Sequence, residues 1–288
     1  MSDGVIHRLC YKPSIPYANG LNCIKRIPKE TVTRHNMTLH YQQISSELAS
    51  HFRLIMADVD GTLTDEHGVS NPAADEAVHL LEESGIPVGF VSGRHLSSLE
   101  SLARQLNISG PIIAENGGIA KLSLDDDILD LGYTRQPALD ALDRLKRLFP
   151  GAIREREDNA ERFVDVVFFA DGVAHADLIE HLRDVQYYDS GYVLHLMERG
   201  ISKGRTLLRL LAEIGYKEMS PTGTVVVGDS PTDISLFELF PHSILIPNPR
   251  LTEEQYRAVW KAARYVSDLP CGDGFARVAR HIVAVRSC

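Results

Sequence analysis

Short apolar segments alternate with amphipathic segments of helical length along most of this 288-residue chain, and this alternation strongly limits its fold. Each apolar segment is too short for a core helix and runs directly into a turn, which is typical of a buried strand. Strands and helices alternating over short links predict an α/β protein with a doubly wound, Rossmann-like parallel sheet, which binds ligands at its strand carboxyl ends. We expect strands at 52–57, 86–91, 111–114, 225–227 and 243–246, and helices at 71–85, 95–107, 203–214, 231–239, 252–263 and 274–285.

Local signals mark several of these boundaries. Asn71 suits the N-cap of a helix and Pro72 its first position, while Gly85 is a typical stop. The segment 38–52, ahead of the first strand, is also expected to be helical. Residues 1–38 are rich in basic residues and show no clear apolar period, so we interpret them as a loosely ordered N-terminal extension. A transit peptide is the alternative.

The regular alternation of strands and helices ends after Gly118, where a different set of elements begins. We expect a hairpin at 119–131, a helix at 137–149, a strand at 163–169, a helix at 173–184 and a strand pair at 185–197. Such a mixture predicts a small α+β domain rather than a continuation of the parallel sheet. The sequence therefore predicts a cap domain at 119–197, inserted into a core made of 39–118 and 198–288.

Composition argues against several classes of function. The formal net charge is −9, with 30 Lys and Arg against 39 Asp and Glu, whereas nucleic acids and anionic membrane surfaces call for a basic binding face. No apolar segment is long enough to span a membrane. The four cysteines form no CxxC pair, which argues against a zinc site or a disulfide framework and favours reduced thiols in the cytoplasm.

The segment Asp58-Val59-Asp60-Gly61-Thr62 follows the first expected strand. Side chains two positions apart in a strand point the same way, so Asp58 and Asp60 are expected to converge at the sheet edge. Two carboxylates this close repel each other unless a cation lies between them or one is protonated. Gly61 allows the chain to turn, and Thr62 can offer its hydroxyl and N–H groups to an anion. Taken alone, the segment could also be a calcium-binding type of loop or a solvated turn.

Three further polar features follow other strands or begin the adjoining helices. Ser92 and Gly93 can form a phosphate cradle after the second strand. Lys203 begins a helix, where its charge can neutralise a phosphate. Asp229 and Asp233 follow the valine-rich strand and are suited to holding Mg²⁺ through oxygen. Each feature alone has a simpler explanation, a plain turn, a solvated lysine or a capped helix start, but their joint occurrence at one edge favours a phosphate and metal site.

The order DVDGT, SGR, Lys203 and GDSPTD resembles the haloacid dehalogenase-like phosphatase superfamily over about residues 52–288. The resemblance implies that Asp58 is the nucleophile, that Asp60 is the general acid/base, and that Ser92 and Lys203 bind phosphate. It implies a Mg²⁺ site formed by Asp58, the Asp60 backbone carbonyl, Asp229, and Asp233 directly or through water. Further candidates for binding phosphate or substrate are Gly61, Thr62, Gly93, Arg94, Asn116 and Thr232.

The position of the insert refines the resemblance. Only a short segment separates Gly61 from the helix at Asn71, so the cap follows the second motif and is similar to the family's C2-type, α+β cap. The segments 111–118 (PIIAENGG) and 189–204 (DSGYVLHLMERGISKG) look like those of archaeal-type phosphoglycolate phosphatases and their sucrose-phosphatase-like relatives. The resemblance implies Mg²⁺-dependent hydrolysis of 2-phosphoglycolate to glycolate and phosphate. We expect the protein to be cytoplasmic, as a monomer or homodimer.

Other functions remain open from the sequence. A sucrose-phosphate or mannosyl-phosphoglycerate type of phosphatase would use the same motifs. A phosphomannomutase shares DVDGTLT and a similar cap, but its usual motif after the second strand is Gly-Gly-Ser-like, from which Ser92-Gly93-Arg94 departs. A non-catalytic binding protein on the same fold is the alternative of another class. On the cap, the candidates for binding a second anion are Arg154, Arg156 and Arg162.

Overall fold

The computed structural model describes residues 37–213 and 220–287. The expected extension at 1–38 therefore lies almost entirely outside the described residues, as does the end of the helix expected at 203–214. Within the described part, Cys271 is buried with a free thiol. None of the helices described there combines the length and the apolar character that a membrane span requires.

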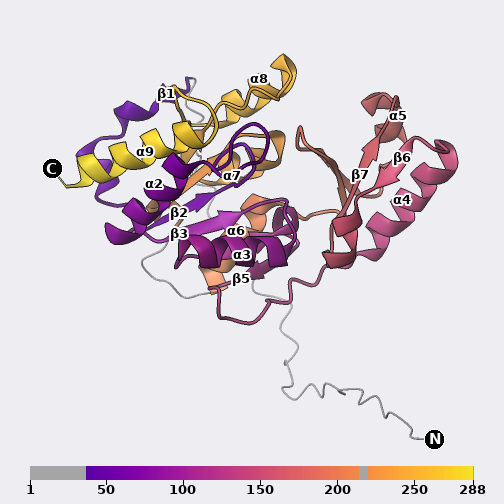
Figure 1. Cartoon of the computed structure of the whole chain (residues 1–288), viewed down its shortest axis with the longest axis horizontal. Coiled ribbons are helices and arrows are strands. Elements are labelled where there is room, and N and C mark those ends of the chain that lie inside the picture. Colours follow the sequence, from indigo (N-terminus) through magenta and orange to yellow (C-terminus); the bar gives the residue numbers. More distant parts are fainter. Residues whose placement is uncertain (1–36, 214–219, 288) are drawn as a thin grey trace, which may run out of the picture. The chain divides into compact units, whose positions relative to one another are not determined.

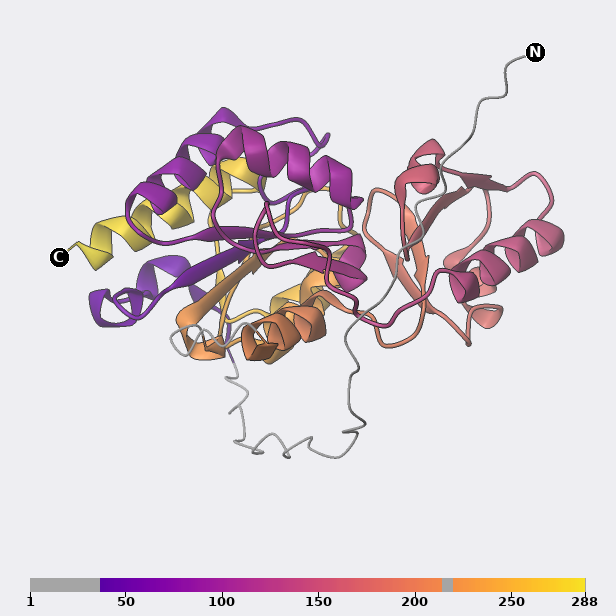
Figure 2. The same cartoon turned by 90° about the horizontal axis from the view of Figure 1, so that it is seen from below.

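The core is an eight-stranded sheet with strand order β1-β12-β11-β10-β2-β3-β4-β5, visible edge-on in Figure 2. Every neighbouring pair is parallel except β4 and β5, which confirms the predicted α/β, Rossmann-like core. The central strands are wholly buried, as their unbroken apolar sequences require. The strands are β1 (Leu39–His40), β2 (Leu54–Ala57), β3 (Val88–Val91), β4 (Ile112–Ala114), β5 (Ile119–Lys121), β10 (Thr224–Gly228), β11 (His242–Leu245) and β12 (Tyr265–Val266).

Helices cover both faces of this sheet (Figure 1). Alternate residues of the strands pack into two separate hydrophobic clusters, one on each face, as the period of a buried strand dictates. The first cluster includes α1 (Ser46–Ala49), α2 (Pro72–Glu83), α3 (Leu96–Leu106) and α9 (Cys271–Arg286). The second includes α6 (Lys203–Glu213), α7 (Ile234–Leu239) and α8 (Glu253–Ala262). This doubly wound arrangement leaves the strand ends free to build a site.

The insert is built on a separate antiparallel sheet with strand order β6-β7-β9-β8. Two helices pack with it around a third hydrophobic cluster, which confirms the predicted α+β cap (Figure 1). Its elements are α4 (Gln136–Leu148), β6 (Ile153–Glu155), β7 (Val166–Ala170), α5 (His175–Glu180), β8 (Gln186–Asp189) and β9 (Leu194–Met197). Strand β6 was not expected from the sequence, because Ile153 is its only buried residue.

Two expected elements differ in the structure. The segment 38–52 is not one helix: β1 joins the sheet edge by pairing with β12, and a 3-10 turn (η1, Tyr41–Gln43) and the short α1 follow. The hairpin expected at 119–131 is reduced to one antiparallel bridge between Ala120 and Leu129, and β5 pairs with β4 instead. We therefore place the proposed boundary between core and cap after Lys121 rather than after Gly118.

The start of α2 follows the predicted capping. The Oδ1 atom of Asn71 accepts hydrogen bonds from the N–H groups of Ala73 and Ala74, at 2.9 and 3.2 Å. The Nδ2 atom of Asn71 also donates to Asp273 of α9, at 3.1 Å. One side chain therefore satisfies helix N–H groups and ties α2 to α9.

We expect Asn71→Ala to lower the free energy of unfolding by about 0.5–2 kcal/mol, because two helix N–H groups lose their acceptor. Asn71→Ser is the matched control, since it also loses the contact with Asp273 but keeps a capping oxygen. Urea titration followed by circular dichroism measures both. Equal losses for the two variants would show that the cap contributes nothing.

Candidate active site

The carboxyl ends of β2, β3 and β10 meet beside a cavity of about 340 Å³. Asp58 follows β2 directly, and its backbone N–H donates to the Val227 carbonyl of β10 at 2.8 Å, which continues the strand pairing. Because Ala57 is in register with Val227, the residues that follow the two strands are close neighbours. Ser92, after β3, lines the same cavity. The sheet topology thus brings the motifs of distant segments together, as predicted.

Three buried carboxylates form the acidic cluster, which we define as Asp58, Asp229 and Asp233. Each offers an oxygen that lies within 4.8 Å of the other two. Burial, together with the nearby charges of Asp233 and Asp60, raises the pKa of Asp58 to about 7, although Lys203 opposes the shift. Burial and the charges of Asp58 and Asp233 raise the pKa of Asp229 well above its ordinary value. The cluster therefore holds more negative charge than its surroundings compensate.

Lys203 is the cation beside this cluster. Its Nζ atom lies 2.7 Å from Asp233 Oδ1 and 3.2 Å from Asp58 Oδ2, and its side chain is only 1% exposed. Burial alone would lower the pKa of Lys203, but the charges of Asp233 and Asp58 outweigh it and raise the pKa above its ordinary value. Lys203 thus offsets part of the negative charge of the cluster, from the position that the sequence predicted at the start of α6.

The donor set of the cluster fits a divalent cation. Asp58 Oδ1 is buried, and no hydrogen-bond partner for it exists in the described chain. Asp229 accepts one hydrogen bond on each oxygen, from Thr62 Oγ1 at 3.0 Å and from Asn248 Nδ2 at 2.6 Å, which leaves lone pairs free. Carboxylate oxygens in this number and charge suit a hard cation such as Mg²⁺.

Asp233 is more fully engaged than its two neighbours. Its Oδ2 atom accepts from the N–H groups of Asp229 and Ser230, both at 3.0 Å, while its Oδ1 atom accepts from Lys203. These contacts fix the loop after β10 and orient the lysine. In this arrangement a role of Asp233 through a water molecule, one of the two forms expected from the sequence, fits better than direct coordination.

Asp60 lines the cavity, but its carboxylate does not belong to the acidic cluster. Arg94 holds it in a bidentate pair, with Nε donating to Oδ2 at 2.9 Å and Nη2 donating to Oδ1 at 2.6 Å. The two aspartates of the motif therefore face different partners. Both line the cavity at the sheet edge, as the sequence predicted, although β2 itself ends at Ala57.

The other predicted binding residues divide into two groups. Those that line the cavity are Ser92, Gly93, Arg94, Asn116 and Thr232. Asn116 is notable because its buried Oδ1 atom has no partner among the described residues, while its Nδ2 atom lies 3.1 Å from His195 Nδ1. Thr62 is fully buried with its hydroxyl donated to Asp229, so it supports the acidic cluster rather than offering that hydroxyl to an anion.

Asn248 and Glu115 are among the residues at the site that were not found from the sequence. Asn248, which donates to Asp229, follows β11, so its position after a strand end was the available signal. Glu115, after β4, is fully buried and accepts hydrogen bonds from three N–H groups of the insert, at Phe163, Val164 and Asp165. No pattern in the sequence indicates that contact. It fastens the insert to the core at the cavity edge.

A comparison with known families identifies the chain. The family model described as haloacid dehalogenase-like hydrolase matches residues 55–160 and 150–278, which together span most of the chain. The chain belongs to the haloacid dehalogenase-like hydrolase family. The resemblance inferred from the four motifs is therefore confirmed.

Relatives of this haloacid dehalogenase-like hydrolase include two phosphoglycolate phosphatases. That of Methanoculleus marisnigri is 30% identical over 233 residues, covering 79% of this chain and 95% of the relative. That of Methanothrix thermoacetophila is 32% identical over 236 residues, covering 80% and 96%. Family and relatives together identify the chain as a phosphatase.

Solved structures share the fold of this hydrolase. A protein of Thermoplasma acidophilum matches with a TM-score of 0.67 and 24% identity, over 80% of this chain and 98% of that one. A haloacid dehalogenase-like hydrolase from Bacteroides thetaiotaomicron matches with a TM-score of 0.62 and 21% identity, over 80% and 99%. At these identities the likeness concerns the fold, with its core and its cap.

Gly61 allows the loop after β2 to approach the acidic cluster. Its φ of +83° favours glycine, and a Cβ atom added there would lie 2.5 Å from Asp229 Oδ2. We expect Gly61→Ala to abolish most activity and to lower stability by more than the roughly 1–3 kcal/mol of backbone strain alone. Gly85→Ala is the matched control, because Gly85 has a φ of +72° but open space around it. Thermal unfolding and phosphate release measure both, and equal behaviour would contradict the close approach.

Proposed function

We propose that this hydrolase is a Mg²⁺-dependent phosphomonoesterase that forms an aspartyl-phosphate on Asp58. The observation that carries the proposal is the state of the Asp58 carboxylate, which lines the cavity, lies 3.2 Å from Lys203 and has one buried oxygen without a partner. A carboxylate held in this way is available as a nucleophile, and the adjacent ammonium can attract a phosphate.

In the proposed reaction a carboxylate oxygen of Asp58 forms a bond to phosphorus as the bond from phosphorus to the ester oxygen breaks. Asp60, carrying a proton once its pair with Arg94 opens, protonates the departing oxygen. As a carboxylate again, it takes a proton from the water that attacks the acyl-phosphate, which releases phosphate and restores Asp58. Lys203 and the loop at Ser92 stabilise charge on the phosphoryl oxygens. Mg²⁺ held by Asp58 and Asp229, with the Asp60 carbonyl that the family resemblance implies, would supply Lewis-acid stabilisation of the same oxygens.

The proposed substrate is 2-phosphoglycolate. Similarity to phosphatases of that name supports it, and so does the size of the cavity. At about 340 Å³ the cavity is at the lower end of the roughly 300–1,000 Å³ typical of ligand pockets, which favours a small leaving group over a disaccharide. Sugar phosphates are the second candidates.

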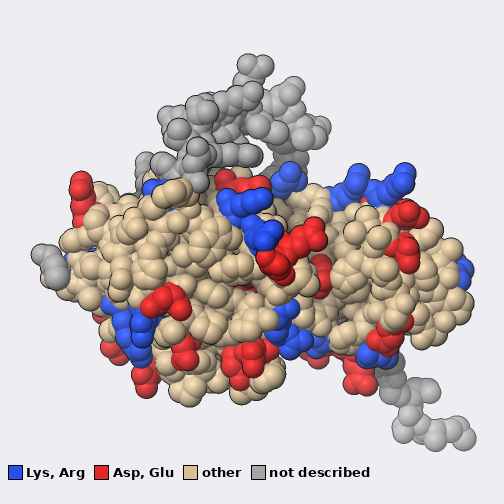
Figure 3. Space-filling view, turned by 90° about the horizontal axis from the view of Figure 1, so that it is seen from above, with Lys and Arg blue, Asp and Glu red and all other residues tan. Residues whose placement is uncertain are grey.

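The remaining features of the proposal concern partners and location. The net charge of −9 and the mixture of acidic and basic side chains on the face in Figure 3 support a small phosphorylated metabolite as partner rather than a nucleic acid. The location in the cytoplasm, the absence of a membrane partner and the state as a monomer or homodimer stay predictions from the sequence.

We expect Asp58→Asn to reduce turnover by a factor on the order of 10⁴ or more, because the amide keeps the shape of the side chain but cannot attack phosphorus. Phosphate release from p-nitrophenyl phosphate in the presence of Mg²⁺ measures the loss. The thermal unfolding midpoint serves as the control for folding. Turnover close to that of the wild type would refute Asp58 as the nucleophile.

A panel of phosphate esters tests the substrate. With Mg²⁺ present, we expect kcat/KM to be highest for 2-phosphoglycolate, compared with sucrose 6-phosphate, mannosyl-3-phosphoglycerate and mannose 1-phosphate. With the metal removed by EDTA, hydrolysis of each should stop and return when Mg²⁺ is restored. A higher kcat/KM for any sugar phosphate would move the assignment to the second candidates, and full activity in EDTA would contradict the metal requirement.

A further inference from the structure

The insert carries three arginines near the cavity, and their surroundings differ sharply. Arg154 belongs to β6 and does not line the cavity: its guanidinium lies 4.3 Å from the centroid of the Phe169 ring, and its Nε atom lies 3.7 Å from Asp171. These contacts leave Arg154 on the surface of the insert. Arg154 therefore serves as the reference with which Arg156 and Arg162 are compared.

Arg162 lines the cavity, but its two terminal nitrogens are already paired. The side chain is 3% exposed, and Nη1 donates to the Gly93 carbonyl and to Asp165 Oδ2, both at 2.9 Å. Its Nη2 atom donates to Asp158 Oδ2 at 3.1 Å. Arg162 thus joins insert to core, and these contacts occupy both of its terminal nitrogens.

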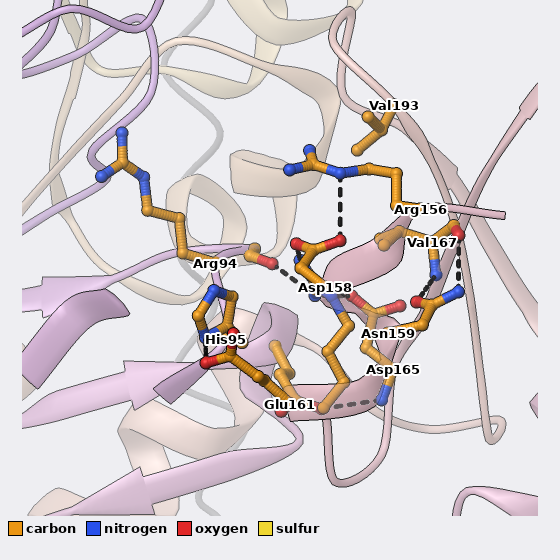
Figure 4. A network of polar contacts seen from close by, with 12 residues as sticks. Arg94, His95, Arg156, Asp158, Asn159, Glu161, Asp165, Val167 and Val193 are labelled. Atoms are coloured by element: carbon orange, nitrogen blue, oxygen red, sulfur yellow. Dashed lines mark hydrogen bonds and ion pairs between the residues drawn. The ribbon is translucent and has the colours of Figure 1, made fainter. Parts of the chain in front are cut away.

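Arg156 differs from both, because its Nε atom is paired and its two terminal nitrogens, within the described part of the chain, are not. It follows the end of β6 and lines the cavity, and its Nε atom forms an ion pair with Asp158 Oδ1 at 3.0 Å. Among the described residues, no carboxylate or carbonyl pairs with its two terminal nitrogens. Figure 4 shows the guanidinium extending from the insert toward the side where Arg94 lies.

Asp158 pairs with Arg156 through charge, since its Oδ1 atom accepts no hydrogen bond from the described residues. The same carboxylate accepts from the buried Arg162, so its position does not depend on Arg156. An arginine paired through its Nε atom presents its two terminal nitrogens as a planar fork, which matches the two oxygens of a carboxylate. His95, which also lines the cavity, is a weaker candidate, because burial lowers its pKa, although the charge of Glu161 opposes the shift.

We propose that Arg156 is the specificity-determining residue that binds a carboxylate on the leaving group of the substrate. The inference rests on the proposed function, which places the phosphoryl group at Asp58 and Lys203, on another part of the same cavity wall. The substrates selected are phosphomonoesters of small hydroxy acids. Esters of the same size without a second anion leave the fork at Arg156 unused.

The test compares 2-phosphoglycolate with 2-hydroxyethyl phosphate, which has an alcohol in place of the carboxylate. We expect the wild type to prefer 2-phosphoglycolate in kcat/KM. In Arg156→Met the ratio of the two kcat/KM values should fall roughly 10- to 100-fold, the usual effect of losing hydrogen bonds to a charged group, mainly through KM. Arg156→Lys should recover part of the ratio, because it restores the charge but not the fork.

Arg154→Met is the matched control, which should leave the ratio at its wild-type value. Binding supplies a second readout: in the Asp58→Asn background, calorimetry should show weaker binding of 2-phosphoglycolate when Arg156 is also replaced by Met, at an unchanged unfolding midpoint.

A wild type that hydrolyses p-nitrophenyl phosphate without preferring the carboxylate ester overturns this inference alone. An unchanged ratio in Arg156→Met does the same. A wild type inactive toward every phosphate ester overturns the proposed function, and the inference with it.

Discussion

The burial of three carboxylates around a single lysine is the constraint on which the rest of the site depends. Removing an ion from water costs several kcal/mol even inside a relaxed protein, and like charges at short range add to that cost. The chain offsets part of it with fixed donors, which are Lys203, Thr62, Asn248 and the N–H groups of Asp229 and Ser230. The charge that remains is what a divalent cation would neutralise, as the proposed Mg²⁺ site requires.

Strand register explains how such an arrangement forms from distant segments. β2 and β10 are adjacent and parallel, so Asp58 and Asp229 follow the same edge although many residues separate them in the chain. The apolar strands supply the folding energy, and the polar residues come directly after them, where the backbone is still held by the sheet. The candidate site residues therefore lie on backbone that the sheet holds in place, as a preorganised site requires.

Much of this could be predicted from the sequence, because buried strands and the residues that follow them carry a strong local signal. Asp58 and Asp60 do line one cavity, as expected, but what each carboxylate contacts could not be predicted, because β2 ends at Ala57. Of the three cap arginines named as candidates, Arg156 and Arg162 line the cavity and Arg154 does not. Where a strand stops, its alternation stops too, and that position is set by tertiary pairing.

Glu115 links the insert to the core through hydrogen bonds. Its buried carboxylate accepts N–H groups from three consecutive insert residues, while the next residue in the chain, Asn116, lines the cavity. Any rotation of the cap must either break those hydrogen bonds or pull the turn after β4 with it. The position of the cap and the shape of the cavity wall are therefore coupled through the peptide unit between Glu115 and Asn116. A ligand that contacts the cap then also affects the cavity wall, and the reverse holds too.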